Sequence, residues 1–113
     1  MNQYEVYELH CEICKVLHHP VRLAVLHALG GGEKSVAELL EGLDVSKANL
    51  SQHMKTLKSR GVVSARREGQ NVFYSLKYPK ILRALELMHE VLLEMFADQG
   101  AIYEEIKGFS VKQ

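Results

Sequence analysis

The sequence predicts a mainly helical α+β fold in which four helices are followed by a two-stranded β-hairpin and a last helix, in the order ααααββα. Two observations lead to this prediction. Apolar residues recur at helical spacing through most of the chain, and after Gly61 their period changes from 3.6 residues to two. With 113 residues the chain has the size of a single domain.

A proline separates the first two helices. Residues 4–18 place five apolar side chains on one helical face, namely Val6, Leu9, Ile13, Val16 and Leu17. Because a residue before proline avoids the α region, this helix should end near His18 and His19. Pro20 should then open a second helix, which ends at the glycines of residues 30–32.

Two serines mark the starts of the next two helices. Ser35 and Glu38 have the spacing of a capping box, which predicts a short third helix through about Leu40. Ser46 is a typical N-cap for a fourth helix, which should run to about Arg60 and close at the following glycine.

The rest of the chain predicts a hairpin and one long helix. Val62–Arg67 and Val72–Lys77 alternate as strands and are joined by a tight turn. Pro79 should open a last helix that runs to about Asp98. We therefore expect one domain over residues 1–98. Residues 99–113 should form a C-terminal tail, partly helical (around Ile102–Ile106) or disordered.

Two short helices joined by a tight turn and followed by a β-hairpin form a winged helix-turn-helix. Three segments carry a closer resemblance: Leu17–Leu23, Val45–Leu57 with its Ser-Gln-His, and the turn Arg66–Gln70 that follows Gly61-Val62-Val63. Over roughly residues 5–97 they resemble the ArsR/SmtB family of bacterial repressors. The resemblance implies a dimeric repressor that leaves DNA when an inducer binds.

Charge is distributed unevenly along the chain. The formal net charge is zero, but residues 46–77 carry seven basic side chains against Glu68 alone, which gives this segment a net charge of +6. Acidic residues outnumber basic ones on both sides of it. Such a basic middle is typical of a surface that binds DNA, and a solvated charged face is the alternative.

The fourth helix has the composition of a DNA-reading helix. Leu50, Met54 and Leu57 should face the core, and the opposite arc is small and polar. On that arc Gln52 can pair with adenine and Ala48 can meet a thymine methyl group. The serine and lysine side chains of this segment suit phosphates. The two arginines at the turn of the predicted hairpin suit the minor groove or its flanking phosphates. The predicted DNA-binding residues are Ser46, Lys47, Ala48, Asn49, Ser51, Gln52, His53, Lys55, Arg66 and Arg67.

Two side chains near this surface have other interpretations. His53 lies beside the core arc, so a role in packing or in orienting the helix is as reasonable as a DNA contact. Tyr74 should point inward from the second strand together with Val72 and Leu76, which makes it a packing residue and not a base-stacking one.

The last helix is more apolar than burial against one domain requires. Its polar residues fill an arc of about 80°, whereas a surface helix needs an apolar arc of little more than 100°. We expect the surplus to be buried in a twofold-symmetric homodimer that addresses a palindromic operator with a repeat of about 34 Å. Central burial in its own domain is the alternative. The expected interface residues are Tyr7, Leu85, Met88 and Leu92.

The first helix carries a candidate sensor site. His10, Cys11, Cys14 and His18 share one side of it and would suit a thiophilic ion such as arsenite, cadmium or zinc. A redox or polysulfide switch at the two thiols is an alternative, and so is simple packing of two small residues at the dimer seam. The usual metal sites of the family are missing, since the third helix has neither thiol nor histidine, and His89 with its neighbouring glutamates has unsuitable spacing.

Other classes of function fit less well. The chain contains none of the common phosphate-loop, serine-hydrolase or zinc-protease motifs, so we do not expect an enzyme. A winged-helix protein-interaction module or a small thiol-redox protein that uses Cys11 and Cys14 remains an alternative, which affinity for duplex DNA would distinguish. No apolar stretch is long enough for a membrane span and no signal peptide is recognisable, so the cytoplasm is the expected compartment.

Overall fold

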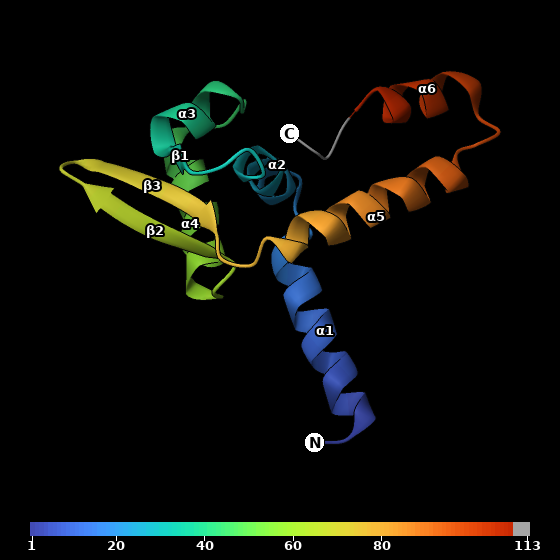
Figure 1. The fold of residues 1–113 in the computed structure, drawn as a ribbon, viewed down its shortest axis with the longest axis horizontal. Coiled ribbons are helices and arrows are strands. Elements are labelled where there is room, and N and C mark those ends of the chain that lie inside the picture. The colour runs from blue at the N-terminus through green and yellow to red at the C-terminus, as the bar shows by residue number, and fades with distance from the viewer. Residues whose placement is uncertain (110–113) are drawn as a thin grey trace.

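The computed structural model describes residues 1–109 and contains the expected helices and hairpin in the expected order (Figure 1). Its first five helices are α1, Gln3–Leu17; α2, Pro20–Leu29; α3, Val36–Glu41; α4, Lys47–Ser59; and α5, Lys80–Met95. The wing consists of β2, Val63–Glu68, and β3, Asn71–Leu76. The winged helix-turn-helix predicted from the sequence is therefore confirmed.

The helices begin at the capping residues that the sequence predicts. The Ser46 hydroxyl accepts a hydrogen bond from the Asn49 amide at 3.0 Å. At the start of α3 the Ser35 hydroxyl accepts from the Glu38 amide, and the Glu38 carboxylate accepts from the Ser35 amide at 3.0 Å. The hydrogen bond from the Ser35 backbone is the main reason why the pKa of Glu38 is lowered. Both caps thus satisfy amides that the helices leave unpaired.

Two elements differ from the prediction. A two-residue strand, β1 at Lys34–Ser35, pairs antiparallel with β3, so the sheet has three strands in the order β1-β3-β2 and is not a bare two-stranded hairpin. A sixth helix, α6 at Gly100–Gly108, occupies most of the C-terminal tail and is longer than the expected turn at Ile102–Ile106. The predicted domain boundary after residue 98 falls between α5 and α6, and residues 110–113 lie outside the described part of the chain.

The core is built mainly from α2, α4 and the start of the wing. Leu26, Leu50 and Leu57 are completely buried, and Val62 and Val63 close the cluster from the strand side. Burial of α4 along one face fixes its rotation, because its apolar residues must point toward α2. The opposite face of α4 is thereby turned outward beside the wing.

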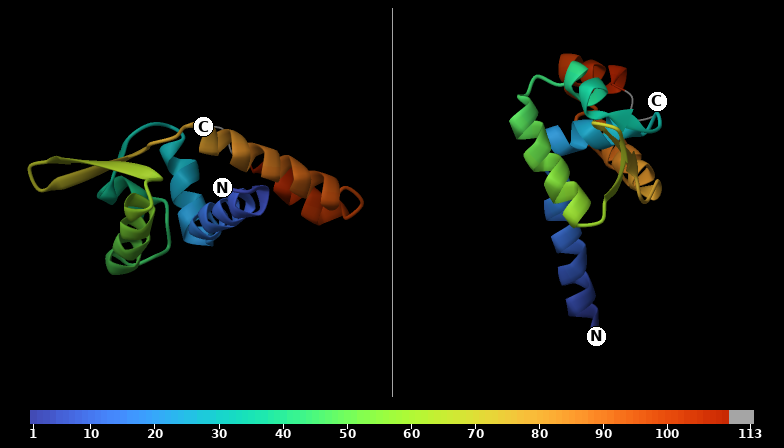
Figure 2. Two further views of the ribbon diagram at one scale, coloured as in Figure 1. Left: turned by 90° about the horizontal axis from the view of Figure 1, so that it is seen from below. Right: turned by 90° about the vertical axis from the view of Figure 1, so that its left-hand side faces the viewer.

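Helices α1 and α5 project away from this core, whereas the wing extends in another direction (Figure 1, Figure 2). The radius of gyration is 15.7 Å, against roughly 13 Å for a compact domain of similar length. Val16 is the only buried residue of α1, and α5 has none. The apolar face predicted on α1 therefore forms, but Val6, Leu9 and Ile13 are 38%, 49% and 39% exposed in the single chain.

Candidate nucleic-acid interface

The outer face of α4 carries most of the predicted DNA-binding residues. Leu50, Met54 and Leu57 are buried, as the helical periodicity predicts. Apart from His53, the predicted DNA-binding residues in and next to this helix are all exposed: Ser46, Lys47, Ala48, Asn49, Ser51, Gln52 and Lys55. Because these side chains are short or flexible, the helix presents a narrow polar ridge of the kind that a major groove admits.

His53 lies on the buried side of α4 and not on this ridge. Its side chain is only 9% exposed, its Nδ1 accepts a hydrogen bond of 3.1 Å from Arg22 Nε, and its ring centroid is 4.2 Å from that of His19. Burial, together with the charges of His19 and Arg22, lowers the pKa of His53. Of the two interpretations of His53, the structure favours the packing role over a DNA contact.

Arg22 extends this contact to the first helix. Its guanidinium also donates to the Val16 carbonyl oxygen at 2.9 Å, near the end of α1. One arginine of α2 thus contacts both α1 and α4, and its partner on α4 lies 31 residues away in the chain. A second link between α1 and α4 is the ion pair of Glu12 with Arg60 at 3.6 Å.

The two wing arginines lie on opposite faces of the hairpin. Arg66 pairs across the sheet with Phe73, and Arg67 pairs with Val72. Arg66 forms ion pairs with Glu33 at 2.8 Å and Glu68 at 2.6 Å, and its guanidinium lies 4.6 Å from the centre of the Phe73 ring.

The charge of Arg66 is thus compensated within the protein. The hydrogen bond from Arg66 lowers the pKa of Glu33, and the bonds to Glu33 and Glu68 raise the pKa of Arg66. Arg67 is exposed and forms no ion pair within residues 1–109. Arg67 is consequently the wing arginine whose charge is available to an external anion, and the sequence could not distinguish the two.

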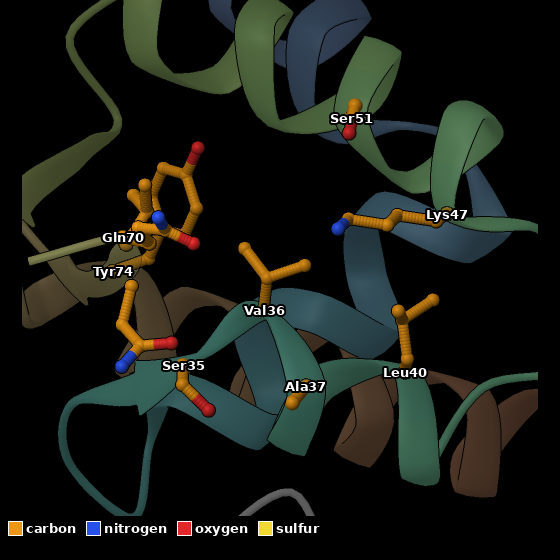
Figure 3. Close-up of a pocket in the computed structure, with 10 residues that line it drawn as sticks. Ser35, Val36, Ala37, Leu40, Lys47, Ser51, Gln70 and Tyr74 are labelled. Carbon is orange, nitrogen blue, oxygen red and sulfur yellow. The ribbon is translucent and has the colours of Figure 1, made fainter.

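A cavity of about 310 Å³ lies between α3, α4 and the wing (Figure 3). Lys47 and Ser51 point into it from α4, Val36 and Leu40 line it from α3, and Tyr74 points across it from β3. The sequence pattern assigned Tyr74 to packing. It does pack against the core, but it also lines this cavity, a dual position that period-two alternation cannot reveal.

The expected interface residues are divided between α1 and α5. Tyr7, Met88 and Leu92 are 53%, 58% and 41% exposed, so each has apolar surface that the chain itself leaves uncovered. Leu85 differs, because it is half-buried and packs against the core of its own chain. Part of the apolar arc of α5 is therefore used within the chain.

The candidate sensor residues of α1 do not assemble a metal site within one chain. Cys11 and Cys14 are exposed free thiols, and Cys11 lines a cavity of about 240 Å³ together with Tyr4, Tyr7 and Glu8. Among residues 1–109 no three His, Cys, Asp or Glu side chains are placed so that they could hold a metal ion. The expected set of His10, Cys11, Cys14 and His18 thus supplies a pair of thiols and not a complete ligand shell.

Comparison with known proteins gives matches to helix-turn-helix transcriptional regulators in sequence and in structure. The pattern of a helix-turn-helix domain family matches residues 16–64. An uncharacterised HTH-type transcriptional regulator of Mycobacterium tuberculosis is 35% identical over 108 residues, which cover 95% of each chain. Its crystal structure superposes with a TM-score of 0.74 at 37% identity, over 85% of this chain and 97% of the other.

Two further relatives carry more specific names. The HTH-type transcriptional repressor SmtB of Mycobacterium tuberculosis is 38% identical over 72 residues, which are 64% of this chain and 53% of the relative. The crystal structure of the AntR antimony-specific transcriptional repressor matches with a TM-score of 0.72 and 30% identity, over 86% of this chain and 87% of the other. Within residues 1–109, none of the helices has the length and apolarity needed to cross a membrane.

Proposed function

The chain belongs to the ArsR/SmtB family of winged-helix transcriptional regulators, and from this premise we propose that it works as a homodimer that represses transcription from a palindromic operator. The observation that carries the proposal is the outward polar ridge of α4 beside the free charge of Arg67, within a segment of net charge +6. The proposed role is binding and not catalysis, and its place is the cytoplasm, where a bacterial repressor meets the chromosome.

In this proposal α4 enters the major groove and the wing approaches the neighbouring minor groove. Gln52 is the residue most suited to reading a base, because its amide can both donate to and accept from adenine. Lys47, Lys55 and Arg67 supply contacts to phosphates, which fix the register but do not distinguish sequences.

The Gln52→Ala variant should lose sequence preference while it keeps most of its affinity for unrelated DNA. Loss of one bidentate base contact costs about 1–3 kcal/mol of discrimination for each half-site. Wild type first enriches its preferred duplex from a random pool. The measurement then compares the affinities of wild type and variant for this enriched duplex and for a shuffled version of it. Equal weakening on both duplexes would show that Gln52 contacts only the backbone.

Lys55→Ala and Arg67→Ala should each weaken binding to all duplexes and flatten its salt dependence. Each removed phosphate contact should reduce the slope of log affinity against log salt by about 0.9 for one half-site. Lys80→Ala, at the start of α5 and outside the basic segment, is the control and should leave the slope unchanged. An unaltered slope in both test variants would place their side chains outside the interface.

The homodimer is supported by the apolar side chains that one chain leaves uncovered. Leu87, Met88, Val91 and Leu92 of α5 are between 41% and 58% exposed, and α1 adds a second uncovered row. Contiguous exposed apolar surface on projecting helices is typical of a protein interface. A second copy can cover both rows symmetrically, which would hold two α4 helices at a fixed separation.

We further propose that an inducer acts on Cys11 and Cys14. Both thiols are exposed, and they lie three residues apart on one of the projecting helices. A thiophilic ion or metalloid would need a ligand from outside this chain, because residues 1–109 offer only the thiol pair at this place. AntR, described as antimony-specific, makes a metalloid a reasonable candidate, and an oxidant of thiols is the other.

A further inference from the structure

The cavity between α3, α4 and the wing lies between the two elements that are proposed to contact DNA. A strand of sugar and phosphate separates each major groove from the neighbouring minor groove. When α4 lies in the former and the wing approaches the latter, that strand must pass between them. The space between α4 and the wing in this protein is the cavity of about 310 Å³ (Figure 3).

We propose that this cavity seats the phosphate strand between the two grooves, and that the Tyr74 hydroxyl donates a hydrogen bond to one of its phosphates. This inference rests on the proposed function. Lys47 and Ser51, on the opposite wall, hold the same strand from the side of α4. Tyr74 thus becomes a positioning residue for DNA and not only a packing residue.

The chemistry of the lining agrees with a phosphodiester strand. Lys47 supplies a positive charge that no carboxylate within residues 1–109 pairs with. The Tyr74 and Ser51 hydroxyls have no hydrogen-bond partner within residues 1–109, so both are available to donate to a phosphate oxygen. Apolar atoms of Val36 and Val72 remain for the deoxyribose.

The register of the wing extends this wall toward the tip of the hairpin. Ala65 pairs with Tyr74, and Arg67 pairs with Val72. Since directly paired residues and residues two apart share a face of a sheet, Arg67 lies on the same face as Tyr74 and Val72. Arg67 therefore lies on the face of the wing that lines the cavity through Tyr74 and Val72, whereas Arg66 lies on the other face with its carboxylate partners.

The size of the cavity is sufficient for this occupant. A volume of about 310 Å³ corresponds to roughly ten water molecules at about 30 Å³ each, which leaves room for a phosphate and part of a sugar. The cavity is partly open to solvent, so a strand can enter it from outside the protein.

Tyr74→Phe tests the inference with the ring and its packing retained. We expect the variant to bind the duplex that wild type enriches from a random pool about tenfold more weakly for each half-site. The same loss should occur on a shuffled duplex, and the salt slope should stay unchanged because the hydroxyl is uncharged. Tyr78→Phe, on an exposed tyrosine outside the cavity, is the matched control and should bind as wild type does.

A second arm locates the phosphate. Single uncharged methylphosphonates are placed along the duplex, and for wild type one position between the two grooves should weaken binding most. Lys47→Met, which keeps an apolar stem, should lose that particular sensitivity. If Tyr74→Phe binds like Tyr78→Phe and the methylphosphonate profile of Lys47→Met equals that of wild type, the inference is wrong. The proposed function would still stand in that event, provided that wild type prefers its enriched duplex.

Discussion

The Leu92→Glu variant should be a folded monomer that binds a palindromic duplex about 100-fold or more weakly than wild type. Leu92 is 41% exposed on α5, so a glutamate there meets water in the single chain. In the proposed dimer it would bury an unpaired carboxylate in each copy, which is strongly unfavourable. DNA affinity should fall when the dimer is lost, because the second half-site then no longer binds as part of a linked pair.

Sedimentation velocity and DNA titration measure the two effects on the same sample. Gln99→Glu, which adds the same charge next to α6, is the control and should remain dimeric. Leu85→Glu is less informative, because Leu85 packs against its own core and a charge there would also unfold the chain. A Leu92→Glu protein that sediments as an undisturbed dimer would contradict this interface.

The second large effect concerns the inducer. Cys11→Ser/Cys14→Ser should bind DNA as wild type does in the resting state and should fail to release it. In such a switch the inducer typically lowers DNA affinity by roughly 5–150-fold, a coupling free energy of about 1–3 kcal/mol. In the double variant the inducer should not change DNA affinity. Arsenite, antimonite, cadmium, zinc and polysulfide are the agents to titrate against the DNA complex.

The structure offers a route from these thiols to α4. Glu12, next to Cys11, pairs with Arg60 at the end of α4, and Arg22 joins the Val16 carbonyl to His53. A bent or rotated α1 would therefore disturb these contacts to α4 and, in the proposed dimer, the contacts to the second copy. With an oxidant, the two thiols would give up two protons and two electrons to it and form one disulfide.

A control variant tests whether the inducer binds the two thiols or a histidine elsewhere. His89→Ala removes the histidine of α5 that a different kind of family site would use, and this variant should still respond. If wild type and the double cysteine variant release DNA identically with every agent, the cysteines only pack.

Local signals were sufficient to predict most of the fold. Ser35 and Ser46 cap the helices that they were expected to cap, and the buried face of α4 is the one given by Leu50, Met54 and Leu57. These features depend on residues within one helical turn or on one repeated spacing. The exposed ridge of α4 could be predicted for the same reason, since it is the complement of the buried face.

The features that the sequence did not reveal depend on distant partners. Strand β1 exists because Lys34 and Ser35 pair with Tyr74 and Phe73, and two residues carry no strand pattern of their own. Arg66 and Arg67 are neighbours that the sequence pattern does not distinguish. They differ in the structure because Glu33, 33 residues before Arg66, pairs with Arg66 alone among residues 1–109. The sequence leaves the role of His53 open, because its hydrogen-bond partner Arg22 lies 31 residues away in the chain.

Sequence-specific DNA binding by this protein is tested by a salt titration of the wild-type protein on the enriched duplex and on its shuffled version. We expect at least about 10³-fold preference for the enriched palindrome, whose half-sites lie about 10–10.5 base pairs apart, and a steep salt slope on both duplexes. Equal affinity for the two duplexes, or no enrichment of any sequence from the random pool, would contradict it.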